Sequence, residues 1–160
     1  MREFSVSANN VTISSNTLAY VHAAAAVSCN LEILRAWAAQ SGSTTSGQCM
    51  IQHVTQVTAF PTLAAATPAP LKQQDQISRI VSSTNGAAGT AGTNATAEGA
   101  GAKTIIWTDA FNNLNGYLWV PTPRETQVNP AGSASGYGIY LPTAPASLVN
   151  WAAGLIFAEV

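Results

Sequence analysis

Residues 103–121, KTIIWTDAFNNLNGYLWVP, decide the fold class. Lys103 to Thr108 is rich in β-branched and aromatic residues, and Tyr117 to Val120 repeats this composition, which is typical of strands. Between them, the segment from Asn112 to Gly116 has the composition of a turn, and Pro121 cannot continue a strand inside a sheet. The stretch therefore predicts two short strands joined by a tight connection.

The same pattern extends through the chain in both directions. Asn9-Asn10 reads as a turn, and Gly136 ends a further loop. Eight or nine short strands without a convincing helix predict an all-β protein, an antiparallel sandwich or barrel with long surface loops, and a jelly-roll-like arrangement in particular. The other predicted strands are Phe4–Ala8, Val11–Ser14, Leu18–His22, Met50–Thr58, Ile77–Val81, Tyr137–Leu141 and Ala152–Glu159.

The stretch from Val27 to Gln40 fits two periodicities. Leu31, Leu34 and Ala38 have helical spacing, whereas Leu31, Ile33 and Trp37 also fit alternation, and a short apolar run does not decide between them. A strand is favoured because residues 41–47 have the composition of a hairpin loop, and a helix stays as the alternative.

Two stretches are predicted to lie outside the strands. Residues 59–76 are rich in Pro and Ala, which predicts a loop or extended arm, because proline cannot occupy a central strand. Residues 82–102 are built almost wholly of Gly, Ala, Thr, Asn and Ser, which predicts a long surface loop. Both belong to one β domain over residues 1–160, a common size for a single domain.

Charged residues make up only 8% of the chain, against roughly 25% in a typical soluble domain. Small and uncharged polar residues must therefore cover most of the surface, which favours contact with other molecules over repulsion. A net charge of −1 without a basic run argues against a nucleic-acid partner. Ala23 to Val27 is too short to cross a membrane, and no apolar signal-peptide core follows Met1, so we expect assembly in a cytoplasm.

No catalytic, cofactor-binding or metal site is predicted. His22 and His53 have no carboxylate or cysteine at metal-ligand spacing, and a structural role is expected for each. Ser133 to Gly136 only imitates a nucleophile elbow and is expected in a hairpin loop, and the Gly86 to Gly101 run lacks the lysine of a phosphate loop. The protein is therefore not expected to be an enzyme.

The cysteines, Cys29 and Cys49, lie in consecutive apolar segments that could be neighbours in a sheet. Buried free thiols are favoured, because a cytoplasm keeps cysteine reduced, and a disulfide is the alternative.

Carboxylates and aromatic residues supply the remaining candidates. The carboxylates are expected in loops or at strand ends, where solvation or turn capping explains them without glycoside hydrolysis. The aromatic side chains would form stacking platforms for a carbohydrate if exposed, although strand aromatics belong more often to the core. These residues are Asp75, Glu98, Asp109 and Glu125, and Trp107, Tyr117, Trp119 and Tyr137.

Three segments carry a resemblance to small proteins that tailed bacteriophages encode beside their capsid genes. The most specific one runs from Asp109 to Glu125 and includes a strand followed by Pro121-Thr122-Pro123. The second is Tyr140 to Leu148, and the third is the closing strand that ends in Phe157-Ala158-Glu159. Phe4 to Ser7 and Pro70-Leu71 match more weakly.

The resemblance implies a structural virion protein, most plausibly a head decoration, or cement, protein that bridges capsomers. Its partner would be the major capsid protein, it would form a homotrimer or another symmetric homo-oligomer, and it would reside on the capsid surface after assembly in the bacterial cytoplasm. A major coat subunit, a tail or fibre module and a carbohydrate-binding β-sandwich are the alternatives.

Overall fold

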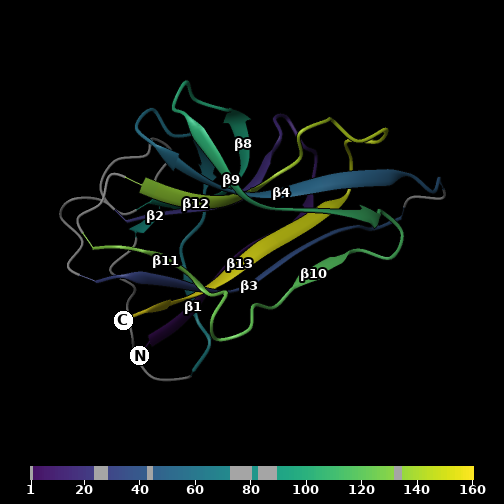
Figure 1. Ribbon diagram of the computed structural model, residues 1–160. Coiled ribbons are helices and arrows are strands. Elements are labelled where there is room, and N and C mark those ends of the chain that lie inside the picture. The colour runs from purple at the N-terminus through teal and green to yellow at the C-terminus, as the bar shows by residue number, and fades with distance from the viewer. Residues whose placement is uncertain (1, 24–28, 43–44, 73–80, 83–89, 132–134) are drawn as a thin grey trace.

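The computed structural model describes residues 2–23, 29–42, 45–72, 81–82, 90–131 and 135–160. Within these ranges the chain forms strands and no helix, so none of its segments is a helix able to span a bilayer. The strands build two sheets that pack face to face (Figure 1). The predicted antiparallel β-sandwich is confirmed.

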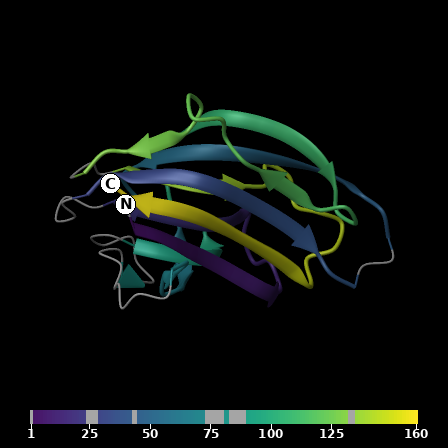
Figure 2. The same ribbon diagram turned by 90° about the horizontal axis from the view of Figure 1, so that it is seen from below.

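The first sheet has the order β10-β3-β13-β1-β6, with β11 paired to β3. Figure 2 shows β3, β13 and β1 side by side, in blue, yellow and purple. The strands are β1 (Arg2–Val11), β3 (Leu31–Gln40), β6 (Ala69–Pro70), β10 (Tyr117–Trp119), β11 (Gln127–Asn129) and β13 (Trp151–Glu159).

The second sheet has the order β5-β8-β2-β12-β4-β9, with β7 paired in parallel to β8. The strands are β2 (Thr17–Ala23), β4 (Gln48–Val57), β5 (Thr62–Ala65), β7 (Val81–Ser82), β8 (Thr90–Ala97), β9 (Lys103–Asn112) and β12 (Ser135–Tyr140).

The connectivity of the eight main strands is that of a jelly roll. The first sheet contains β10-β3-β13-β1 and the second contains β9-β4-β12-β2. The first strand pairs with the last, and the second with the one before the last. Consecutive main strands lie in opposite sheets, except that β4 pairs with β9. Because residues 41–47 connect β3 to β4, the hairpin loop predicted there instead crosses between the sheets, with residues 43–44 outside the described ranges.

The core lies between the two sheets and follows the alternation of the strands. Phe4 of β1 and Phe157 of β13 are fully buried, with ring centroids 5.9 Å apart. Both cysteines are buried thiols, as favoured from the sequence. Other fully buried large side chains of this core are Trp151, Tyr137, Leu31, Ile33, Ile51, Ile139, Leu141 and Leu155, whereas Tyr20 is buried in a smaller cluster with Leu63 and Ala95.

Two predictions near the N-terminus are wrong. Asn9-Asn10 is not a turn, because β1 continues through it to Val11, and the strand predicted to end at Ser14 does not form beyond Val11. The register with β13 shifts between Ala8 and Val11, and Asn10 has a φ of 54°. Asparagine tolerates this left-handed backbone, so the pair accommodates a bulge rather than a reversal.

The surface loop predicted over residues 82–102 is also wrong in part. Thr90–Ala97 forms β8, which pairs with β2 on one side and β5 on the other, and residues 83–89 lie outside the described ranges. Ala91 and Ala95 are fully buried, and a Cβ added to Gly92 would come within 2.5 Å of the Leu63 Cβ. The small residues therefore permit close packing, which the composition alone could not distinguish from a loop.

The Pro-rich stretch 59–76 is an edge segment rather than a free arm. It contains β5 at the edge of the second sheet and β6 at the edge of the first, and residues 73–76 lie outside the described ranges. Edge strands are where proline is tolerated, since one side of the strand needs no ladder hydrogen bond. Of the strand predicted at Ile77–Val81, only Val81 is described, in β7. The short strand β11 was not predicted.

Candidate functional site

A cavity of about 140 Å³ opens between the β9 edge of the second sheet and β10 and β11 of the first. We call it the aromatic pocket, because four of its seven lining side chains carry rings. The lining residues are His53, Ile106, Trp107, Trp119, Glu125, Gln127 and Tyr137.

A bulge in β9 provides one wall of the aromatic pocket. His53 of β4 is opposite Trp107, whereas the next residue, Val54, is opposite Ile105, so Ile106 is the extra residue. Bulges redirect side chains, and here both Ile106 and Trp107 line the cavity. Because β9 is the last strand of its sheet, Trp107 stays 44% exposed.

His53 forms the buried inner wall of the aromatic pocket. Its Nδ1 bonds the Tyr137 hydroxyl, and its Nε2 lies 2.9 Å from the Tyr117 hydroxyl. Burial lowers the pKa of His53 to about 4, although the Asp109 carboxylate acts in the opposite direction. The ring is therefore neutral at pH 7, with one nitrogen donating and the other accepting. Trp119 packs edge-on against it, with ring centroids 4.7 Å apart.

Two polar side chains lie at the outer side of the aromatic pocket. Glu125 uses Oε2 to accept hydrogen bonds from the Thr122 backbone N–H, at 3.3 Å, and hydroxyl, at 2.9 Å. Within the described part of the chain, neither its Oε1 nor the Gln127 amide has a hydrogen bond. Both can therefore bind a hydroxyl group of a small molecule.

The structure divides the four predicted aromatic platforms into two pairs. Tyr117 and Tyr137 are buried, as expected for strand aromatics, and burial raises the pKa of both hydroxyls. Trp107 and Trp119 are accessible and line the same cavity from different sheets. The sequence contains both tryptophans, but only the pairing of strands brings them together with Glu125.

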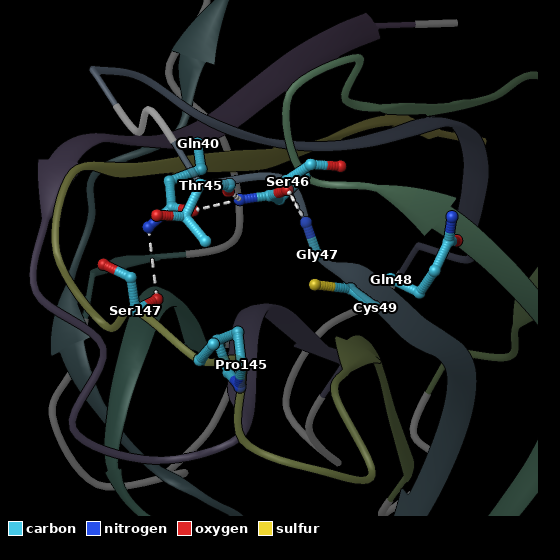
Figure 3. Close-up of a pocket in the computed structure, with 10 residues that line it drawn as sticks. Gln40, Thr45, Ser46, Gly47, Gln48, Cys49, Pro145 and Ser147 are labelled. Atoms are coloured by element: carbon cyan, nitrogen blue, oxygen red, sulfur yellow. Dashed lines mark hydrogen bonds between the residues drawn. The ribbon is translucent and has the colours of Figure 1, made fainter.

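A second cavity, of about 130 Å³, lies where residues 45–49 meet residues 145–147. We call it the polar pocket. The Cys49 sulfur points toward the space between Thr45, Pro145 and Ser147 (Figure 3). Burial raises the pKa of the Cys49 thiol.

The amides around the polar pocket bond one another. Gln40 donates from Nε2 to the Ser147 carbonyl, at 3.2 Å, and to the Val149 carbonyl, at 2.9 Å. Asn113 donates to Gln40 Oε1, at 2.8 Å, and to the Thr45 carbonyl, at 3.0 Å, and accepts from the Gly47 N–H at 2.7 Å. The network therefore joins loops to β3 and leaves little bonding capacity for a ligand.

Glu98 is the centre of a third polar cluster, on the outer side of the second sheet. Burial would raise its pKa, but hydrogen bonds from Lys103, Ser15 and Thr17 outweigh this and hold the pKa below its usual range. Thr17 donates both its backbone N–H and its hydroxyl, each at 2.7 Å. The carboxylate thus holds the segment after β8 against the start of β2 and the start of β9.

The remaining sequence candidates do not join these clusters. His22 is buried against Phe60, with ring centroids 3.9 Å apart, and burial lowers its pKa to about 4. Ser135 and Gly136 belong to β12 rather than to a hairpin loop. Asp75, Ser133 and residues 86–89 of the glycine-rich run lie outside the described ranges.

The described residues contain no group of three or more His, Cys, Asp or Glu side chains placed to hold a metal ion. No protein-family model matches the chain, and no similar curated protein or solved structure was found.

Proposed function

We propose that the protein is a non-catalytic structural component of a tailed-bacteriophage virion, a decoration protein that binds the major capsid protein on the head surface and bridges capsomers. The proposal rests on the sequence resemblance and on one structural observation, which is a group of exposed apolar side chains on the outer side of the first sheet. The jelly roll is compatible with it, since viral capsid proteins use this architecture, although lectins do so too.

The open surface is the outer side of β10, β3 and β13, which we call the apolar face. Leu118 is 66% exposed, and it pairs with Trp37, which in turn pairs with Gly154. A Cβ on Gly154 would lie 2.2 Å from the Trp37 ring, so the indole lies flat against the sheet. Val128 of β11, 49% exposed, extends the same face.

This surface suits permanent burial against a repeated partner. Apolar and aromatic side chains carry a small desolvation cost on binding, and the charged side chains on the same side of β3, Glu32 and Arg35, lie toward the β11 end of the face. With charged residues at 8% of the chain, few charges would have to be desolvated in such a contact. A symmetric oligomer, such as a trimer, would present the face several times and add avidity.

The test compares two substitutions of exposed apolar residues on opposite sheets. Leu118→Asp places a charge on the apolar face, whereas Met50→Asp, at a residue 49% exposed on the second sheet, is the matched control. Virions lacking the protein would be mixed with each purified variant, and bound copies would be counted by electron microscopy and quantitative mass spectrometry. We expect hundreds of copies per head for wild type and Met50→Asp, and loss of binding for Leu118→Asp.

Other results of this binding experiment would contradict the proposed decoration role. A handful of copies at a vertex or tail would indicate a tail or fibre module, and shells formed by the purified chain alone would indicate a coat subunit. If both variants decorate heads like wild type, the apolar face is not the contact surface.

A further inference from the structure

The aromatic pocket has the features of a ligand site that the proposed capsid role does not use. It lies between the sheets at the β9 edge, whereas the apolar face lies on the outer side of the first sheet. Its chemistry is also different, since it combines accessible indole surface with two polar groups, Glu125 Oε1 and the Gln127 amide, that have no hydrogen bond to any described residue. A ligand in the aromatic pocket would therefore leave the apolar face free, whatever that face binds.

The walls of the pocket suit a ligand with one apolar face. Trp107 reaches it from the β9 bulge and Trp119 from β10, and the buried His53 and Tyr137 close the inner end. Indole rings bind the C–H face of a sugar ring, as they bind other flat ligands, through dispersion and their negative π surface. Because both His53 nitrogens are bonded to tyrosine hydroxyls, the inner wall offers no charge and little hydrogen-bonding capacity.

The outer side of the pocket suits a ligand with hydroxyl groups. Glu125 Oε1 can accept, and the Gln127 amide can both donate and accept. Thr122 holds the other Glu125 oxygen, which fixes the carboxylate without consuming its full capacity. A pyranose presents such a combination, with C–H groups on one face and hydroxyls around its rim.

Size and charge restrict the ligand further. A volume of about 140 Å³ is well below the roughly 300–1,000 Å³ of pockets for drug-sized ligands, so one ring enters and the rest of a glycan stays outside. The Glu125 carboxylate lines the cavity, and the Asp109 carboxylate is close enough to act on the pKa of His53. Both disfavour an acidic sugar.

We propose that the aromatic pocket binds a single neutral pyranose unit of a glycan, with the sugar face against Trp107 and its hydroxyls bonded to Glu125 and Gln127.

The experiment titrates the full chain with the methyl glycosides of glucose, galactose, mannose and N-acetylglucosamine, and with glucuronic acid. Binding is followed by the indole N–H resonances in ¹H–¹⁵N NMR spectra, which separate the tryptophans from one another. We expect at least one neutral glycoside to shift the Trp107 and Trp119 signals, with no shift of Trp37. Glucuronic acid should bind more weakly than the methyl glycoside of glucose.

Three variants test the residues. Trp107→Ala, at a side chain that is already 44% exposed, should weaken binding about tenfold or more. Gln127→Ala should weaken it several-fold without affecting the fold. Leu118→Ala is the control, because Leu118 precedes Trp119 on β10 but faces the opposite side of the sheet.

Three results would overturn the inference. One is the absence of any indole shift with every glycoside at tens of millimolar, and another is binding that survives both Trp107→Ala and Gln127→Ala. A third is binding of a proline-rich peptide at this pocket with no glycoside bound, which would assign the pocket to a protein partner instead.

Discussion

The two pockets of this jelly roll are nearly equal in volume and opposite in chemistry. In the polar pocket, Gln40 and Asn113 share five hydrogen bonds with each other and with the neighbouring backbone. In the aromatic pocket, the Gln127 amide has no hydrogen bond within the described residues, and Trp107 is half exposed. The hydrogen bonding of the polar groups, rather than the size of a cavity, therefore distinguishes a structural junction from a candidate binding site.

The largest effect that we expect is the response to acid of two buried histidines, one in the aromatic pocket and one outside both pockets. Burial holds the pKa of His53, in the aromatic pocket, and of His22, against Phe60, at about 4, below the ordinary 6.5. Between pH 6.5 and 4 the unfolded chain therefore binds more protons than the folded one, so stability falls as the pH falls. At pH 4.5 each histidine should cost about 2–3 kcal/mol.

Urea unfolding at pH 7.5 and pH 4.5 measures this loss. The variant His22→Gln should remove about half of it and leave the part that belongs to His53. A free energy of unfolding that stays constant down to pH 4.5 would show that neither histidine is buried in the neutral form.

A second substitution breaks the polar pocket. Asn113→Ala removes three hydrogen bonds, to Gln40 Oε1, the Thr45 carbonyl and the Gly47 N–H, of which only the bond to Gln40 is fully buried. An orphaned buried polar group costs about 1–3 kcal/mol when water cannot replace the lost bond, and Gln40 Oε1 is in such a position, so we expect a loss of about 1–3 kcal/mol in urea unfolding. A loss below about 0.5 kcal/mol, the usual scatter of surface substitutions, would mean that the network is not structural.

The smallest effect is expected for the corresponding amide of the aromatic pocket. Gln127→Ala removes a side chain without a hydrogen bond in the described chain, so the free energy of unfolding should change by no more than about 0.5 kcal/mol. Thermal and urea unfolding beside Asn113→Ala make the comparison direct. If Gln127→Ala lowers the free energy of unfolding as much as Asn113→Ala does, the side chain of Gln127 has a structural role, and the contrast between the two pockets is wrong.

The two long polar or Pro-rich stretches show why some elements could not be found from the sequence. By composition, the glycine and alanine of β8 indicate a loop. In the structure these small residues allow Leu63 to approach Gly92 closely, and this contact exists only because β5 pairs with β8. Likewise, β11 is only three residues long, and it forms a strand because it pairs with β3. Pairing partners far along the chain decide such elements.

The all-β class, most of the main strands and the low charge of the surface could be predicted from the amino-acid sequence alone. These follow from local properties, which are alternation with period two, turn residues and composition. Only the tertiary structure decided which aromatic residues are accessible, since Tyr137 is buried and Trp107 is not, although both lie in strands. Exposure depends on whether a strand lies at the centre or the edge of its sheet, and a bulge then determines where its side chains point. The meeting of Trp107, Trp119 and Glu125 is therefore a property of the assembled sandwich, because the residues reach it from different elements.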